Sequence, residues 1–443
     1  MALQPRLSAN GIELNREFRN ALAIIEGSGK NLFITGRAGA GKSTLLAYLR
    51  SITSKRIAIL APTGVAALNV GGQTIHSFCR FKPDITPETV ERLSNVSFAT
   101  ANMYKSLDTI VIDEISMVRA DLLDCLDRFM RLNGRNPDKR FGGVQMIFVG
   151  DLYQLPPVVT EGERGIFEGQ YKSPYFFDSR VFDGLELEFV ELKSYYRHSD
   201  PKFIELLNAI RDNTATEDDL EKINRRFDES GGAPATPYLY ITLTTTNSIA
   251  DRINNIYLEK IPARRYEYRA LITGKFGRGV YPADDVLCLK EGAQVMMLNN
   301  DSKKRWVNGS LGRVVSIGGK GEDGGIVVEL EDGKRESVAP YTWETSKLSY
   351  DSVGKKLVST STGSFTQYPL MLAWAVTIHK SQGKTFDHVI IDVGDGTFAH
   401  GQLYVALSRC TTLEGIVLRR KLQMRHIITD ARIAEFHRAH FQE

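Results

Sequence analysis

Residues 36–43 read GRAGAGKS and fit the pattern GxxxxGK[ST] of a phosphate-binding loop. The apolar run NLFIT (31–35) precedes them, and residues 43–51 have the pattern of a helix. A strand, this loop and then a helix is the context in which the pattern binds phosphate. Without those flanking elements, the same letters are a chance glycine-rich turn.

Phosphate binding by this loop would rest on its backbone and on the first turn of its helix. Glycines let backbone N–H groups turn toward phosphate oxygens, and the helix N-terminus adds its positive dipole end. Lys42 is expected to reach the β- and γ-phosphates, and Ser43 is expected to bind Mg²⁺. The remaining residues that we assign to this nucleotide site are Gly36, Gly39, Gly41 and Thr44.

A pair of carboxylates follows the apolar run TIVI (109–112). Asp113 is placed to hold Mg²⁺ through water, and Glu114 to orient and deprotonate the attacking water. Phosphoryl transfer needs both, because positioning and charge neutralisation supply most of its catalysis. An isolated Asp-Glu is usually a solvated turn. Roughly seventy residues after a phosphate loop, it favours a catalytic pair.

Further polar candidates each have a plain structural alternative. Gln154, in GDLYQLPP (150–157), would sense the γ-phosphate, or is only a polar loop residue. Arg197 in SYYRHSD and Arg409 at the end of YVALSR would stabilise charge on a triphosphate. A salt bridge is the alternative for each arginine, and spacing alone favours it.

Alternation of apolar runs with helical patterns predicts an α/β fold with parallel sheets covered on both faces. The expected strands are 31–35, 57–60, 109–112 and 145–149 in the first half, and 239–243, 294–298, 388–393 and 415–418 in the second. The expected helices are 43–51, 118–132, 248–261 and 401–409.

Two stretches interrupt this alternation. Residues 80–105 have little apolar periodicity and suggest a small insertion. Residues 311–366 contain short β-type runs, such as LGRVVSI and KKLVST, between Gly- and Asp-rich turns. They predict a small all-β barrel inserted in the second domain.

Composition excludes several classes of protein. The 443 residues carry 56 Lys+Arg and 53 Asp+Glu, a net charge of +3, with 42% apolar residues. This is an ordinary globular chain, and any DNA-binding charge must be focused in a groove. The four cysteines are far apart, which predicts reduced thiols rather than disulfides or zinc. We find no signal peptide or membrane span and expect a cytoplasmic protein.

Ordered blocks give the chain a resemblance to a known family. They are GRAGAGKST, APTGVAALNVGGQTIHSF, VIDEISM, GDLYQLPPV, YYRHSDPKF, LTTTN, LKEGAQVMML, NGSLGRVV, WAVTIHKSQGKTFDHVIID and YVALSR. The chain resembles the Pif-type (petite integration frequency) DNA helicases, in the RecD-like branch of superfamily one, over about residues 13–420. It is similar to the short bacterial members.

The resemblance implies two RecA-like domains, 1–194 and 195–443, with ATP between them. We expect the insertion at about 80–105 in the first domain to be wedge-like, and the insertion at about 311–366 in the second to be an SH3-like β-barrel. It implies the roles given above for the phosphate loop and the carboxylates, makes Gln154 the γ-phosphate sensor, and favours Arg197 and Arg409 as nucleotide contacts. It adds Gly383 as a backbone contact near the phosphates.

The family also places single-stranded DNA across the tops of both domains. Hydroxyls and backbone amides suit phosphates, and His and Phe rings can stack on bases. Phe78 as a core residue and His379 as a turn residue are the alternatives. The matching positions are Pro62, Thr63, Gly64, His76, Ser77, Phe78, Thr377, His379 and Lys380.

The chain departs from the family in two places. Phe18, in LNREFRNAL (14–22), stands where members often have a Gln that reads adenine. Either Asn15 contacts the base or Phe18 simply packs, which leaves adenine preference open. His198 stands where Gln commonly follows the motif arginine.

The resemblance implies an ATP- and Mg²⁺-dependent DNA helicase that moves 5′ to 3′ on single-stranded DNA and unwinds tailed duplexes. G-quadruplexes and RNA–DNA hybrids are plausible family substrates. We expect a monomer, without membrane contact, in the bacterial cytoplasm. The alternatives are a small-molecule phosphotransferase, an ATP-gated DNA clamp, and a motor subunit of a nuclease complex.

Overall fold

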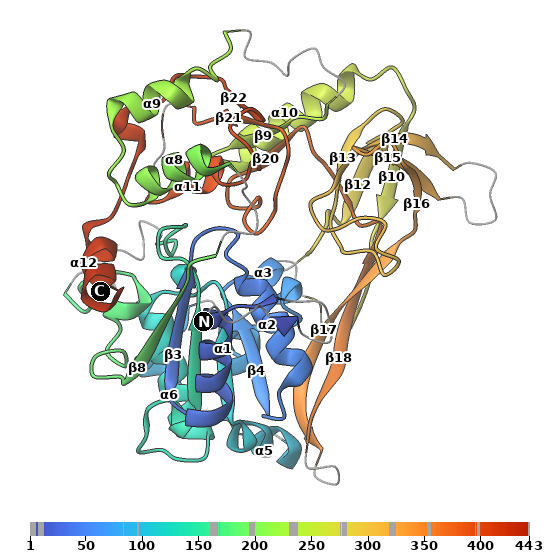
Figure 1. The fold of residues 1–443 in the computed structure, drawn as a ribbon. Coiled ribbons are helices and arrows are strands. Elements are labelled where there is room, and N and C mark those ends of the chain that lie inside the picture. The colour runs from blue at the N-terminus through green and yellow to red at the C-terminus, as the bar shows by residue number, and fades with distance from the viewer. Residues whose placement is uncertain are drawn as a thin grey trace.

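The structure is a computed structural model of the chain (Figure 1). It describes residues 6–7, 13–82, 84–94, 97–159, 167, 169–194, 200–229, 238–274, 276, 281–318, 325–351, 356–394, 396 and 399–441.

The first domain is built on a six-stranded parallel sheet in the order β5-β4-β6-β7-β3-β8. Its central strands are almost wholly apolar and buried, as a sheet covered on both faces requires. The strands are β3 (Asn31–Gly36), β4 (Ile57–Ala61), β5 (Gln73–Thr74), β6 (Thr109–Ile112), β7 (Gln145–Val149) and β8 (Leu187–Leu192).

Helices of this domain connect the strands and bury one face each. Helix α6, for example, buries Leu123, Leu126, Phe129 and Met130 on one side. The helices are α1 (Arg16–Ala23), α2 (Lys42–Ile52), α3 (Gly64–Asn69), α4 (Ile75–Cys79), α5 (Phe98–Ser106) and α6 (Ala120–Asn133). A short strand pair, β1 (Arg6–Leu7) with β2 (Glu13–Leu14), precedes them.

The second domain has a four-stranded parallel sheet in the order β20-β9-β21-β22. The two parallel sheets confirm the prediction of two RecA-like domains. The strands are β9 (Ile241–Thr244), β20 (Ala375–Thr377), β21 (Val389–Asp392) and β22 (Ile416–Leu418), and the helices are α8 (Pro201–Arg211), α9 (Glu217–Asn224), α10 (Asn247–Lys260) and α11 (Gln402–Leu407).

An antiparallel unit is inserted between α10 and β20. Its largest sheet has five strands in the order β16-β15-β14-β13-β19, and a strand pair β10–β12 lies beside it (Figure 1). The strands are β10 (Arg265–Arg269), β12 (Val286–Lys290), β13 (Gln294–Met297), β14 (Leu311–Ile317), β15 (Ile326–Leu330), β16 (Arg335–Val338) and β19 (Leu370–Leu372).

The antiparallel unit includes residues that we had expected in the parallel sheet. We expected residues 294–298 in the parallel sheet, but β13 pairs antiparallel with β14 and β19. An apolar run of this length fits either kind of sheet, so its letters could not decide. The SH3-like form of the unit stays a prediction.

A long hairpin reaches from this unit to the first domain. Strands β17 (Tyr341–Asp351) and β18 (Lys356–Gln367) form a sheet with β11 (Leu271–Gly274), separate from the five-stranded sheet. We expected the run KKLVST to be a short barrel strand. Instead β18 is part of this hairpin, and β17 packs against α5 and β5 (orange in Figure 1).

The chain ends by returning to the first domain. Helix α12 (Ala431–Phe441) packs against β8, far from the second sheet (Figure 1). Its Phe436 stacks on Phe177 with ring centroids 4.5 Å apart, and Arg432 pairs with Asp178. The buried core therefore runs without interruption from one domain into the other.

Candidate nucleotide and DNA site

The phosphate loop joins the end of β3 to the start of α2. Gly41 caps α2 with a left-handed φ of 90°, a conformation that favours glycine. Lys42 Nζ donates to the carbonyls of Gly36 and Arg37 at 2.6 and 3.2 Å. Burial lowers the pKa of Lys42, while Asp151, Glu114 and Asp113 oppose that shift. Lys42 thus lies within electrostatic reach of three carboxylates.

Ser43 and Thr44 lie exposed in the first turn of α2. Gly36 is held closely, since a Cβ there would lie 2.8 Å from the carbonyl oxygen of Leu192. Neighbouring strands end at the same edge of the sheet, where Ile34 of β3 pairs with Val149 of β7 and Ile112 of β6 pairs with Phe148.

The paired carboxylates follow β6 at this edge. Asp113 is buried, and burial raises its pKa. Glu114 has a φ of 49°, a left-handed conformation that is uncommon outside glycine and frequent at functional sites. Its Oε2 is buried without a hydrogen-bond partner among the described residues. Burial, with help from Asp113, raises the pKa of Glu114 to about 7.

The loop after β7 presents Asp151 and Gln154, both buried. Gln154 Nε2 donates to Asp151 Oδ2 at 3.1 Å, and the backbone N–H of Tyr153 donates to Asp151 Oδ1 at 3.2 Å. Gln382 Nε2, from the second domain, donates to Gln154 Oε1 at 3.4 Å. Gln154 is therefore held from both domains.

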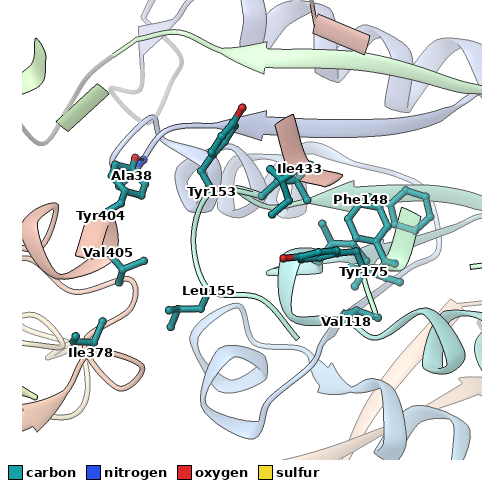
Figure 2. Packing of buried hydrophobic residues seen from close by; sticks show 14 of the residues in the cluster. Ala38, Val118, Phe148, Tyr153, Leu155, Tyr175, Ile378, Tyr404, Val405 and Ile433 are labelled. Carbon is teal, nitrogen blue, oxygen red and sulfur yellow. Dashed lines mark hydrogen bonds between the residues drawn. The ribbon is translucent and has the colours of Figure 1, made fainter. Parts of the chain in front are cut away.

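The second domain closes this edge with α11. The N–H of Ala38, in the phosphate loop, donates to the Tyr404 hydroxyl at 3.1 Å (Figure 2). Gly401 allows this approach, since a Cβ there would lie 2.3 Å from the Tyr153 carbonyl oxygen. Figure 2 also shows Ile378 and Val405 of the second domain in the same buried cluster as Leu155 of the first domain.

Arg409 lies fully buried behind α11. Its Nε donates to Val405 O at 3.0 Å, and its Nη2 donates to Ser408 Oγ at 2.9 Å. Its positive charge is close enough to oppose the rise in the pKa of Glu114 that burial and Asp113 cause. Gly383 has a φ of 76° and faces open space. Arg197 and His198 lie outside the described residues.

The stretch before the phosphate loop shows why Phe18 is not a base reader. Its ring is 1% exposed and packs in a core behind β3. Asn15 caps α1, accepting from the Phe18 N–H at 2.8 Å and donating from Nδ2 to Ser194 Oγ at 3.0 Å.

The expected DNA contacts of the first domain lie around α3 and α4. Thr63 caps α3, accepting from the Ala66 N–H at 3.2 Å, and is exposed, as is Ser77. Pro62, Gly64 and His76 are half-buried. A pocket lies between this face and β17, lined by Gly64, Ser77, Phe276, Glu344 and Thr345 among others.

Phe78 corrects one expectation. It is 2% exposed, and its ring packs edge-on against Tyr104 with centroids 5.3 Å apart. Its ring has no free face on which a base could stack, so the core alternative holds in this structure.

The expected DNA contacts of the second domain follow β20. Thr377 is buried and its hydroxyl accepts from the Lys380 N–H at 3.3 Å. His379 is half-buried, and burial lowers its pKa. Lys380 is exposed. Of these three, only Lys380 places a full charge at the surface.

Several residues at the cleft were missed by sequence reasoning. Asp151, Gln382 and Tyr404 lie inside quoted blocks, next to residues that we did assign. Arg211 and Asp212 lie in none of those blocks, and their sequence offers no local signal.

Comparison with known proteins decides the family. The sequence model described as PIF1-like helicase matches residues 13–221, and that of the UvrD-like helicase C-terminal domain matches residues 372–417. The ATP-dependent DNA helicase Pif1 of Bdellovibrio bacteriovorus is 32% identical over 96% of this chain and 92% of its own length. The chain belongs to the PIF1-like helicase family. It is an ATP-hydrolysing DNA helicase.

Solved structures of PIF1-like helicases agree with this. Bacteroides sp Pif1 in complex with ADP-AlF4 is 38% identical and matches with a TM-score of 0.87 over 97% of each chain. Bacteroides Pif1 with ADP-AlF3 and single-stranded DNA matches at 38% identity and a TM-score of 0.70, again over 97% of each chain. By TM-score, this chain therefore superposes better on the first of these two structures than on the second.

Cysteines, metal-binding clusters and membrane-spanning helices can be checked outside the cleft. No disulfide joins the four cysteines, and Cys79, Cys125 and Cys410 are buried. Within the described ranges, no group of three or more His, Cys, Asp or Glu side chains is arranged to hold a metal ion on its own. Among the described residues, no helix is long and apolar enough to cross a membrane. The cytoplasmic location stays a prediction.

Proposed function

We propose that this helicase moves 5′ to 3′ along single-stranded DNA, unwinds tailed duplexes, and hydrolyses Mg²⁺–ATP in the cleft between its two RecA-like domains. The main support for an ATP site is that Lys42, Glu114 and Gln154 lie together at one edge of the sheet, with the second domain packed over that edge. Direction rests on membership of the family.

Lys42 binds the β- and γ-phosphates once it leaves the loop carbonyls that it now contacts. Glu114 accepts a proton from the attacking water, because its carboxylate is buried, its Oε2 has no hydrogen-bond partner among the described residues, and its pKa is near neutrality. Gln154 senses the γ-phosphate. Arg409 and Arg197 offset charge that develops there.

Magnesium fits the residues at this edge. A hydroxyl from Ser43 and a buried carboxylate from Asp113 are oxygen ligands, and Mg²⁺ usually binds through one or two such groups together with phosphates and water. When bound, the ion neutralises phosphate charge. Gly36, Gly39, Gly41, Thr44 and Gly383 complete the phosphate contacts.

Single-stranded DNA crosses the exposed hydroxyls of Thr63 and Ser77 and the exposed cation Lys380. Pro62, Gly64, His76, Thr377 and His379 shape the surface between them. Support comes from the burial pattern and from the Bacteroides Pif1 structure with single-stranded DNA. G-quadruplexes and RNA–DNA hybrids are further substrates to test, and we expect a monomer.

The first test measures ATPase activity with and without single-stranded DNA, for the parent and for Lys42→Ala. We expect strong stimulation by DNA in the parent and background turnover in the variant. Turnover by the parent that ignores DNA would exclude the motor function.

The second test compares duplexes that carry only a 5′ or only a 3′ tail. Preferential unwinding of the 5′-tailed duplex is expected, and preference for the 3′ tail would refute the direction. ATPase activity without any strand displacement would instead support an ATP-gated clamp, or a motor that needs a nuclease partner.

A further inference from the structure

The end of helix α8 inserts a buried charge into the first domain. Arg211, the last residue of α8, is 2% exposed. Its Nη2 lies 3.6 Å from Asp151 Oδ1, and its guanidinium centre lies 4.1 Å from the centroid of the Tyr153 ring. Both contacts belong to the loop after β7 that carries Gln154. The second domain thus touches the sensor loop with a cation.

The next residue, Asp212, brings a negative charge to the phosphate loop. Asp212 caps α8, and its Oδ2 lies 3.7 Å from Nη2 of Arg37 in the phosphate loop. Arg211 Nη1 also donates to Asp212 Oδ1 at 2.9 Å. Asp151, Arg211, Asp212 and Arg37 therefore form a line of alternating charges, which we call the charged chain. It runs from the sensor loop to the phosphate loop through the end of one helix.

The charged chain ends on the group that orients Gln154. Asp151 is wholly buried and accepts the Gln154 side-chain amide at 3.1 Å. A buried carboxylate needs a nearby cation or several donors, because desolvation penalises its charge. Arg211 supplies that cation from the other domain. The position of α8 therefore affects how firmly Asp151 holds Gln154.

Stability alone gives a poor reason for Arg211 at this place. Its Nε and Nη2 make no hydrogen bond within the part of the chain that the structure describes. Leaving such donors unpaired in a protein interior is costly, and replacing a buried ion pair by apolar groups is often neutral or stabilising. A functional reason is required.

We propose that Arg211 is a positioning residue for ATP hydrolysis, which couples the γ-phosphate-sensing loop to the second domain through Asp151. This inference rests on the proposed role of Gln154. A γ-phosphate competes with Asp151 for the amide of Gln154, and the Asp151 carboxylate then depends more on Arg211. The attraction draws α8 toward the sensor loop, while Asp212 holds the phosphate loop through Arg37. Hydrolysis thus becomes dependent on domain closure.

The test compares Arg211→Met with Arg419→Met. Arg419 makes a 3.0 Å ion pair with Asp392 in the same domain, outside the charged chain, so its variant controls for loss of an ion pair. Melting temperature, KM for ATP, DNA-stimulated kcat and base pairs unwound per ATP are measured. For Arg211→Met we expect a melting temperature below that of the control, because buried Asp151 loses its cation, together with an unchanged KM, a kcat lower by about a hundredfold, and fewer base pairs per ATP.

Two more variants separate positioning from folding. Arg211→Lys restores the charge but not the planar fork, so it should recover part of kcat. The double variant Asp151→Asn with Arg211→Met removes both charges, and should melt like the parent yet stay slow. If Arg211→Met fails to fold, Asp212→Asn tests the same charged chain at an exposed position, with lower kcat at an unchanged melting temperature.

The inference is overturned if Arg211→Met matches Arg419→Met in kcat and in base pairs per ATP, or if the double variant regains parental kcat. Gln154→Ala and Lys42→Ala are measured beside them. Normal hydrolysis by Gln154→Ala would reject the sensor assignment itself. Loss of activity in both of these variants, with normal Arg211→Met, would reject only the role of Arg211.

Discussion

The raised pKa of Glu114 predicts a pH dependence of ATP hydrolysis. A general base works only when it is deprotonated, and burial together with Asp113 holds the pKa of Glu114 at about 7. The sign follows directly: protonation at lower pH removes the base, so activity falls as pH falls. An unperturbed glutamate, with a pKa of about 4.3, would stay ionised throughout this range.

The size of the effect follows from the pKa. With a value of about 7, about nine-tenths of Glu114 is ionised at pH 8 and about one-tenth at pH 6. DNA-stimulated kcat/KM for ATP should therefore fall about tenfold between these pH values, because kcat/KM reports the free enzyme. On the proposed function, Mg²⁺ bound beside Asp113 would reduce the repulsion on Glu114, so the acidic limb in kcat should lie at lower pH than the limb in kcat/KM.

The assay follows ATP hydrolysis from pH 5.5 to 9 at saturating single-stranded DNA, with Mg²⁺ in excess over ATP at every pH. Circular dichroism at each pH verifies that the protein stays folded. Glu114→Gln should lower kcat by about 10²–10⁴-fold and abolish the acidic limb in what activity remains. A flat kcat/KM between pH 6 and 8 in the parent, or the same limb in Glu114→Gln, would refute the assignment of the base.

Three further outcomes follow from burial and charge. Lys380→Gln should reduce the steepness of the plot of log K for single-stranded DNA against log salt by about 0.7. Lys334→Gln, at an exposed position in the β15–β16 turn, should leave that slope unchanged. Phe436→Ala removes a nearly buried ring that stacks between α12 and the first domain, which should lower the free energy of unfolding by about 3–5 kcal/mol. The melting temperature of this variant should therefore fall well below that of Met424→Ala, because the Met424 side chain is 38% exposed. Phe18→Gln should lower the melting temperature without raising the preference for ATP over GTP, because position 18 lies in the core; a gain in ATP preference would contradict this.

Local pattern was enough to find the parts of the fold that are determined locally. The runs NLFIT, TIVI and QMIFV became β3, β6 and β7 because apolar branched residues before a loop fit a buried parallel strand. The pattern failed where partners are distant in sequence. Residues 294–298 give no sign that they pair with β14 and β19, and the return of α12 to β8 has no local cause.

The candidate site divides in the same way. Lys42 was predicted from the phosphate-loop pattern, and Asp113 and Glu114 were predicted because they follow a buried strand; strand ends of a parallel sheet meet at one edge. Phe78 shows the limit of residue type as a guide, since an aromatic ring serves a core as well as a base stack. Arg211 was invisible because its partner lies sixty positions earlier, in the other domain.

Three contacts across the cleft end on or beside groups that we assign to the nucleotide site. Ala38 meets Tyr404, Gln154 meets Gln382, and Asp151 meets Arg211. On the proposed function, phosphate and the second domain therefore compete for, or share, the same atoms of the first domain. No separate transmission device is needed, because a change at the γ-phosphate is already a change at the domain boundary. A near-neutral chain suits such a motor: weak bulk attraction to DNA leaves grip and release to a few exposed groups, whose positions the cleft can move.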